Sequence, residues 1–385
     1  MPKWKAILLS IFSGVEDGVD RVLGNLRRKL FRMGPVTIVP YLGHGTQRVL
    51  YIHGRALENF KPISALETDS IWKNILSFLQ RFQTREIRKA RVMMRLGSVE
   101  QEVQADKEGY IQATLMLPEP LPPNQIWHTV ELQLVDYPDS TPTKCQVLVP
   151  PPDAQFGVIS DLDDTVIRTD VLHMLKMVRN TFLGNSRTRL PFAGAAEFYQ
   201  ALQKGTGSTY NPIYYVSSSA WNLYDLFTDF FAVRGIPIGP LFLNDVGLSP
   251  TYFIRPGHLE HKFKVIEMLL ATHPNLPFLL IGDSSEKDPL VYLQVVQNHP
   301  GRIKTVYIRD VAEGRRDIPI NRVAELMQKG GSELVLVRDT VGAAVHAAEK
   351  GYINPEALPA IRQERREDKQ PPLPSESVLD VVKDT

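Results

Sequence analysis

Short apolar segments alternate with longer amphipathic segments through residues 153–352, and this alternation limits the possible folds more than any other feature. The apolar segments have the length of buried strands, and the amphipathic segments have helical periodicity. Strands that alternate with helices are typical of an α/β domain with a doubly wound parallel sheet. The expected strands are Phe156–Ile159, Ile213–Val216, Phe278–Ile281, Thr305–Ile308 and Leu334–Val337, and the expected helices span 170–183, 194–203, 221–233, 260–272, 289–298 and 340–349.

Residues 35–152 have a different pattern, with short candidate strands and one candidate helix. Val130, Leu132 and Leu134 alternate with polar residues, as expected for a sheet with one solvent-exposed face. We therefore predict a small β-sandwich-like domain that ends at the rigid segment Pro150–Pro152. The expected strands are Val36–Tyr41, Val49–His53, Lys89–Leu96, Tyr110–Leu115 and Thr129–Val135, with one helix at Trp72–Phe82.

The two ends of the chain have compositions of their own. In residues 1–34, apolar residues recur at spacings of three and four with basic neighbours, which predicts an amphipathic helix that ends at Gly34-Pro35. The pattern suits a helix on an anionic membrane surface and a helix packed on the protein itself equally well. A signal peptide is a third, weaker alternative, because the apolar stretch is short and the cleavage site is poor. Residues 353–385 are charged and rich in proline, which predicts a disordered tail.

Composition limits the class of protein. With 385 residues, 43% hydrophobic residues and 23% charged residues, the chain is long enough for two globular domains. The net charge of +1 gives no reason to expect a nucleic-acid partner. The single cysteine, Cys145, excludes an intrachain disulfide framework and a cysteine-rich metal site. The chain contains no run of about 20 apolar residues, the length that a membrane-spanning helix needs. We therefore expect a cytoplasmic protein, which could associate with a membrane surface through residues 1–34.

Three histidines lie in the β-rich region. His44, His53 and His128 do not have the spacing of metal ligands, so we interpret them as ordinary polar or half-buried histidines.

Two acidic residues follow the first expected strand of the α/β region. Asp161 and Asp163 lie two residues apart, and Thr165 lies two residues further on. Ligands of parallel α/β sheets bind at this end of the strands. One aspartate at such a position can attack phosphorus, and a second can transfer the proton of the leaving group. Taken alone, the short pattern also suits a solvated acidic turn that caps the next helix.

A serine cluster follows the second expected strand. The hydroxyl of Ser217 and the backbone amides of Ser218 and Ser219 have the chemistry to hold a phosphoryl oxygen. Alternatively, Ser218 or Ser219 is only the N-cap of the next helix.

A lysine and two further acids complete the set. Lys262 lies near the start of the helix that precedes the third strand, where an ammonium group would offset phosphoryl charge, and Lys264 competes with it for this role. Asp283 ends the third strand and Asp288 follows five residues later. Carboxylate oxygens are the ligands that Mg²⁺ prefers, and a carboxylate beside four apolar residues is costly to bury without a partner or a metal.

The order DxDxT, strand-Ser, Lys, strand-GDxxxxD resembles the haloacid dehalogenase superfamily of aspartate-nucleophile phosphotransferases. More narrowly, four segments resemble the phosphatidate phosphatase domain of the actin-patch-protein type, a family related to the lipins. These segments are Ser160–Val166, Tyr215–Tyr224, Ile281–Pro289 and Tyr307–Asp310. The upstream pairs Pro40-Tyr41 and Gly54-Arg55 are similar to the preceding part of that family. Ala220 replaces the usual proline of the second motif, a change that concerns loop rigidity.

This resemblance implies Mg²⁺-dependent hydrolysis of phosphatidate to diacylglycerol and phosphate through an aspartyl-phosphate. The implied catalytic residues are Asp161 as nucleophile, Asp163 as acid and base, Thr165, Ser217 and Lys262, and the implied metal site is formed by Asp161, Asp163 and Asp283, with Asp288 supporting it from outside. Two other functions remain compatible with the sequence: a related phosphatase for a soluble phosphomonoester or a phosphoprotein, and a non-catalytic membrane adaptor.

Overall fold

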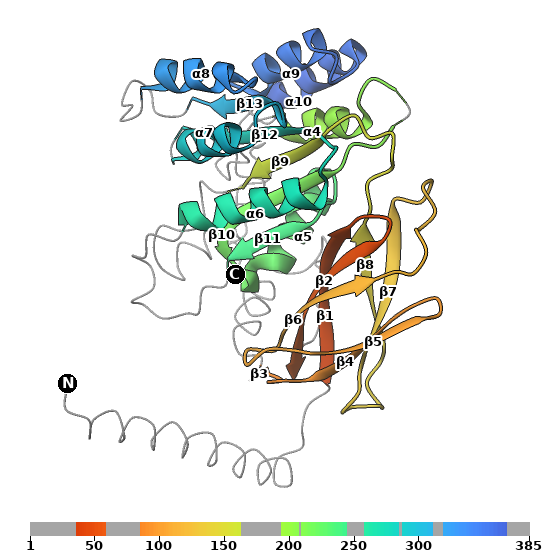
Figure 1. Cartoon of the computed structure of the whole chain (residues 1–385). Helices are drawn as coiled ribbons and strands as arrows, with labels where there is room; N and C mark the ends of the chain where they lie inside the picture. The colour runs from red at the N-terminus through yellow and green to blue at the C-terminus, as the bar shows by residue number, and fades with distance from the viewer. Residues whose placement is uncertain are drawn as a thin grey trace, which may run out of the picture.

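The structure, a computed structural model, describes residues 36–58, 85–162, 194–207, 209–244, 258–284, 287–310 and 319–367. These residues form a β-rich part and an α/β part, which lie side by side (Figure 1). The helices predicted at 1–34, 72–82 and 170–183 fall outside the described residues. Within the described residues, no helix has the length and apolarity needed to cross a membrane.

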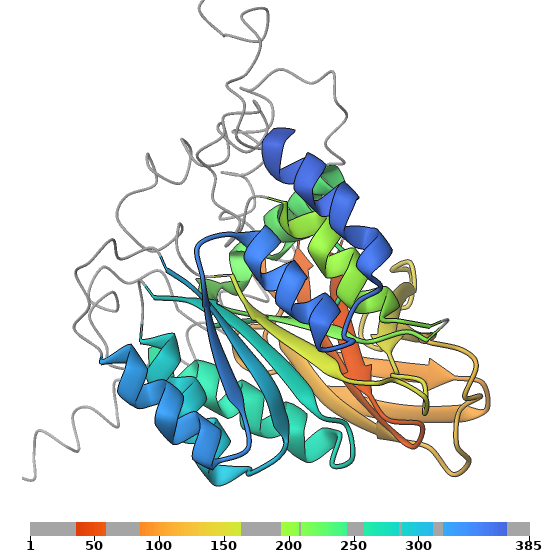
Figure 2. The ribbon, with the colours of Figure 1, turned by 90° about the horizontal axis from the view of Figure 1, so that it is seen from above.

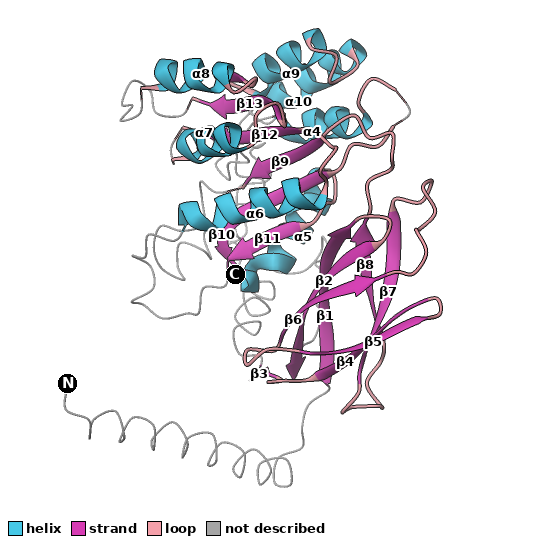
Figure 3. Ribbon diagram, in the orientation of Figure 1, coloured by secondary structure: helices cyan, strands magenta, loops and turns pink. Residues whose placement is uncertain are grey.

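The β-rich part is one mixed sheet of eight strands among the described residues, in the order β3-β2-β1-β8-β7-β4-β5, with β6 paired to β2. We predicted the two sheets of a sandwich, whereas here β1 pairs with both β2 and β8 and joins the strands into one strongly curved, barrel-like sheet (Figure 3). The alternation predicted at 130–134 is confirmed, because Val130, Leu132 and Leu134 are buried. The strands are β1 (Val36–Gly45), β2 (Val49–Glu58), β3 (Arg85–Glu86), β4 (Arg91–Leu96), β5 (Val99–Gln104), β6 (Tyr110–Met116), β7 (Trp127–Leu134) and β8 (Thr143–Leu148).

The α/β part is built on a parallel sheet in the order β11-β10-β9-β12-β13-β14. The chain enters this sheet in the middle with β9, adds β10 and β11 on one side, and then crosses to add β12, β13 and β14 on the other. The direction of strand addition therefore reverses between β9 and β12, and ligands of open α/β sheets bind at such a reversal. The strands are β9 (Gly157–Asp161), β10 (Ile213–Ala220), β11 (Leu241–Asn244), β12 (Phe278–Asp283), β13 (Ile303–Arg309) and β14 (Glu333–Val337).

Helices cover both faces of the parallel sheet (Figure 2). Alternate residues of the buried strands supply two separate cores: Val158 and Leu279 pack on one face, and Ile159 and Leu280 on the other. This is the predicted doubly wound arrangement. The first face is covered by α4 (Ala195–Lys204), α5 (Tyr224–Arg234), α9 (Thr340–Glu349) and α10 (Leu358–Glu367), and the second by α6 (His258–Thr272), α7 (Asp288–Asn298) and α8 (Ile320–Lys329).

Helix α10 corrects the prediction that the tail is disordered from residue 353 onwards. Ile361 is fully buried in the core beneath α4 and α9, and the Glu364 carboxylate accepts the backbone N–H of Glu197 at 2.9 Å. Arg365 forms an ion pair with Asp339 at the start of α9. The segment contains few apolar residues, so composition favoured disorder, while tertiary contacts of a few side chains hold the helix.

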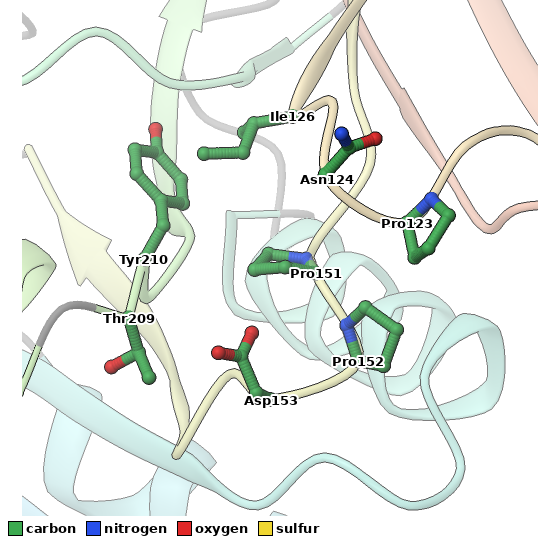
Figure 4. A pocket seen from close by; sticks show the side chains of 8 residues that line it. All are labelled: Pro123, Asn124, Ile126, Pro151, Pro152, Asp153, Thr209 and Tyr210. Atoms are coloured by element: carbon green, nitrogen blue, oxygen red, sulfur yellow. The ribbon is translucent and has the colours of Figure 1, made fainter.

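The junction between the two parts contains a cavity of about 460 Å³ (Figure 4). It lies at the amino ends of β9 and β10, on the side of the sheet opposite to the carboxyl ends of these strands. Its lining residues are Pro123, Asn124, Ile126, Pro151, Pro152, Asp153, Thr209 and Tyr210.

Candidate active site

Asp161 and Asp283 are the last residues of two neighbouring parallel strands, β9 and β12, at the point where strand order reverses. Ile281 pairs with Ser160, so the two aspartates are offset by about one residue along the strands. Their relative exposures are 3% and 1%. Carboxylates this deeply buried are stable only with charged or hydrogen-bonding partners.

Lys262 supplies such a partner. Its Nζ lies 2.9 Å from Asp161 Oδ1 and 3.0 Å from Asp288 Oδ1, and its side chain is buried. Lys264, two residues further along α6, is 70% exposed and pairs with Glu260 at 2.7 Å. The structure therefore brings Lys262, and not Lys264, to the acidic residues at the ends of β9 and β12.

Asp288, the first residue of α7, connects Lys262 to the end of β12. One of its oxygens binds the Lys262 ammonium, and the other accepts the backbone N–H of Asp283 at 3.4 Å. Gly282 permits this close approach, since a Cβ at that position would lie 2.5 Å from Asp288 Oδ2 and 2.9 Å from the hydroxyl of Tyr292. Asp288 therefore contacts both the Lys262 ammonium and the backbone at the end of β12.

Two residues that sequence reasoning did not select also belong to the site. Arg309 ends β13 as the direct cross-strand partner of Asp283, and its guanidinium lies 3.6 Å from Asp283 Oδ2. Tyr292 on α7 donates its hydroxyl to the carbonyl of Ile281 at 3.0 Å. Burial, and after it the carboxylates of Asp288, Asp161 and Asp283, raise the pKa of Tyr292 well above its usual value, so this hydroxyl keeps its proton. Arg309 could have been identified in the sequence from its position at the end of an apolar strand.

The charges of this cluster favour a further cation. Among these five side chains, Asp161, Asp283 and Asp288 are acidic and Lys262 and Arg309 are basic, so acidic groups outnumber basic groups by one. Oxygen donors of this kind suit Mg²⁺. In the described part of the chain, no three His, Cys, Asp or Glu side chains are already gathered as a metal site. Asp161 and Asp283 end the neighbouring strands β9 and β12, and Asp288 Oδ1 and Oδ2 already have the partners described above.

Ser217, Ser218 and Ser219 lie beside Asp161. Val216 pairs with Asp161 in the β9–β10 ladder, and the carbonyl of Val216 accepts the N–H of Leu162 at 3.0 Å. The N–H of Ser219 donates to Ser217 Oγ at 3.1 Å, and all three serines are buried.

The N-cap alternative for these serines is wrong. Strand β10 continues to Ala220, a 3₁₀ turn at Trp221–Leu223 follows, and Leu223 is the N-cap of α5. Ser219 Oγ is buried and has no hydrogen-bond partner within the described residues. A buried hydroxyl without a partner is unfavourable in the absence of a ligand, which makes Ser219 a further candidate for contact with a phosphoryl oxygen.

Asp163 and Thr165 fall outside the described residues, so their roles stay predictions. The three histidines of the β-rich part lie elsewhere in the fold and hold no acidic partner in the described residues. Burial lowers the pKa of His53 to about 4 and lowers the pKa values of His44 and His128 below the usual value. We predicted ordinary polar or half-buried histidines, and His44 and His128 are more deeply buried than this.

Comparison with known proteins connects this site to one family. Residues 156–310 match the model of the family described as phosphatidate phosphatase APP1, catalytic domain. Phosphatidate phosphatase APP1 of Saccharomyces cerevisiae is 26% identical over 225 residues, which cover 55% of this chain and 38% of that protein. An uncharacterized protein of Schizosaccharomyces pombe is 25% identical over 157 residues, which cover 40% of this chain and 25% of that protein.

The chain spans well under half the length of these two relatives. Among solved structures, a carbohydrate acetylesterase from Xanthomonas citri has 13% sequence identity over 82% of this chain and 75% of its own, with a TM-score of 0.29. This likeness is too low to support an argument about fold or function.

Proposed function

We propose that this chain hydrolyses phosphatidate to diacylglycerol and phosphate by the aspartate-nucleophile chemistry of the haloacid dehalogenase type, and the match of residues 156–310 to the APP1 phosphatidate phosphatase catalytic-domain model supports this proposal. The observation that supports this most directly is the buried cluster at the end of β9, where Lys262 holds the Asp161 carboxylate at 2.9 Å, beside the end of β12. A carboxylate fixed at a strand end in this way is preorganised to act on a ligand bound there.

In the proposed reaction, an Asp161 carboxylate oxygen attacks phosphorus, and the bond between phosphorus and the glycerol oxygen breaks. Asp163 gives its proton to the departing diacylglycerol oxygen. Asp163 then takes a proton from water, which attacks the aspartyl-phosphate, releases phosphate and regenerates Asp161. Lys262 offsets the negative charge of the phosphoryl group, and the serines at the end of β10 bind its oxygens. Thr165 holds the loop that carries Asp163. Mg²⁺, held by Asp161, Asp163 and Asp283, would neutralise charge on the transferring group.

The direct test is phosphate release from phosphatidate in mixed micelles, with and without Mg²⁺, compared with lysophosphatidate and a soluble phosphomonoester. Asp161→Asn should lower turnover at least about 10³-fold, because the amide is a poor nucleophile, while the melting temperature shows that the fold persists. Asp153→Asn is the matched control, because Asp153 is exposed and lies at the amino end of β9. Normal hydrolysis by Asp161→Asn would remove the nucleophile assignment, and preference for the soluble ester would favour a different phosphatase.

Peripheral membrane contact through residues 1–34 is part of the same proposal, because phosphatidate resides in a bilayer. The support is the amphipathic, basic pattern of these residues. Deletion of residues 2–30 should lower activity on liposomes more than activity on a soluble phosphomonoester. Equal losses on both substrates would count against a membrane role.

A further inference from the structure

Strand β1 of the β-rich part contains a bulge at Leu42 and Gly43. Tyr41 pairs with His53, and pairing with β2 resumes at His44 opposite Tyr51, so two residues of β1 face one residue of β2. A bulge interrupts the ladder and redirects backbone groups. Gly43 suits this position, because a Cβ there would lie 2.5 Å from the carbonyl oxygen of Tyr51.

The bulge directs the Leu42 N–H toward the α/β part. This N–H donates to the hydroxyl of Tyr224 at 2.7 Å, a contact between residues 182 positions apart. Tyr224 is the first residue of α5 and is buried, and burial raises the pKa of its hydroxyl, which is neutral as a result. A backbone donor of one part is therefore satisfied by a side chain of the other.

Aromatic contacts strengthen the same connection. The Tyr41 ring stacks on Trp221 with ring centres 4.5 Å apart and an interplanar angle of 19°. It also packs on Tyr224, with ring centres 4.5 Å apart. Tyr41 belongs to the core on one face of the parallel sheet, so this contact is part of the packed interior and not a loose surface contact.

These contacts fix the far end of the serine segment of β10, Ser217–Ser219. At its near end, Val216 is bonded to β9 beside Asp161. Trp221, at its far end, follows Ser219 by two residues and rests on Tyr41. The hydroxyl of Ser219, which lacks a partner in the described residues, lies between these two anchors.

We propose that the β-rich part completes the phosphate site, and that Tyr41 and Tyr224 are positioning residues that set the place of Ser217–Ser219 through Trp221 and the first turn of α5. This inference rests on the proposed function, because it assigns phosphoryl binding to the serine segment. A displacement of about 1 Å at such a site lowers activity by as much as about 100-fold, so loss of one anchor has a measurable effect without unfolding.

The experiment measures the dissociation constant of inorganic phosphate by titration calorimetry in Mg²⁺ buffer, together with kcat and KM on phosphatidate and the melting temperature. Tyr224→Phe removes only the acceptor of the Leu42 N–H. It should weaken phosphate binding and lower kcat/KM by about tenfold. Tyr210→Phe is the matched control. It deletes the hydrogen bonds of the Tyr210 hydroxyl with Gln203 Nε2 at 3.0 Å and with the side chain of Trp127 in the β-rich part, just before the amino end of β10. It should leave both quantities unchanged.

A second pair of variants tests the stack. Tyr41→Ala should weaken phosphate binding about tenfold, and Tyr41→Phe, which keeps the ring, should restore it. A purely structural role would lower the melting temperature of Tyr224→Phe and Tyr41→Ala and leave the phosphate dissociation constant unchanged, and this result would overturn the proposal.

The outcome separates this inference from the proposed function. A wild-type protein that binds phosphate but does not hydrolyse phosphatidate would refute the substrate, while the phosphate dissociation constants would still decide the role of Tyr41 and Tyr224. A wild-type protein that neither binds phosphate nor hydrolyses phosphatidate would overturn both.

Discussion

Acid should destabilise the contact between the two parts of the molecule. His44 and His53 of the β-rich part stack with ring centres 5.9 Å apart, and both meet the edge of Phe242 in the α/β part. His273, which follows the last residue of α6, has its Nε2 atom 3.0 Å from the hydroxyl of Tyr214 on the other side of this contact. Both ring nitrogens of His44 lack hydrogen-bond partners within the described residues. A proton added to any of these rings would place a positive charge in an apolar interior.

The size of the effect follows from the pKa values. Burial lowers the pKa of His53 to about 4, and burial together with Arg302 lowers that of His273 to about 4, whereas an unfolded histidine titrates near 6.5. The unfolded state therefore takes up protons first, so this stability is complete above about pH 6.5 and is lost as the pH falls toward 4. At pH 5, His53 and His273 should each lower the free energy of unfolding by about 2 kcal/mol relative to neutral pH.

His44 should add to this loss, because burial, and then His53 and His273, lower its pKa well below the usual value.

The assay is urea unfolding at pH 7.5 and pH 5.0, followed by tryptophan fluorescence and circular dichroism. His44→Phe keeps an aromatic ring against Tyr51 and Phe242 and removes the titratable nitrogens. Between the two pH values, the free energy of unfolding of this variant should fall by less than that of the wild type. His299→Phe is the control, because that imidazole is partly exposed and lies 2.7 Å from Glu267. Equal acid losses in His44→Phe and the wild type would refute the reasoning.

Three further substitutions test the packing. Lys262→Met should abolish phosphate release and lower the free energy of unfolding by about 3–5 kcal/mol, because two buried carboxylates lose their shared ammonium. Lys264→Met should change the free energy of unfolding by less than about 0.5 kcal/mol. Equal effects of the two variants in urea unfolding would contradict the role of Lys262 in the site. Gly282→Ala should lower the free energy of unfolding by about 1–3 kcal/mol, because the new Cβ clashes with a carboxylate oxygen of Asp288. Gly342→Ala should raise it by about 0.4–1 kcal/mol, because its Cβ meets nothing closer than 3.7 Å. A higher melting temperature for Gly282→Ala than for Gly342→Ala would contradict these two predictions. Ile361→Ala should cost about 2–4 kcal/mol if α10 is anchored as described, and an unchanged calorimetric transition would show that it is not.

The parallel sheet was predictable because strands buried on both faces appear as continuous apolar runs. Strand β12, Phe278–Asp283, is buried throughout, and the sequence marked it clearly. Strand β11, Leu241–Asn244, was missed because four residues are too few to separate from a loop. Strand β5, Val99–Gln104, was missed for another reason: most of its residues are exposed, so it has neither an apolar run nor an alternating pattern.

The acids of the candidate site were identifiable from their spacing, but their partners were not. Lys262 and Lys264 lie two residues apart on one helix and so point to nearly opposite faces, and only packing shows which of them is buried. Arg309 meets Asp283 through the register of β12 and β13. Tyr41 meets Trp221 across a boundary that the sequence marks only as a change of periodicity. Contacts of this kind depend on the tertiary arrangement and leave no local pattern.

The irregularity in β1 also bears on how such proteins tolerate insertions and deletions. Removal of one residue at Leu42 or Gly43 would restore a regular ladder, in which Tyr41 still pairs with His53 and His44 with Tyr51. The backbone N–H that the bulge turns toward Tyr224 would be displaced, and the hydroxyl of Tyr224 would lose this donor. Chain length in this strand should therefore be under stronger selection than the identity of most of its residues, and chimeras that exchange the β-rich part between relatives should keep activity only when this extra residue is retained.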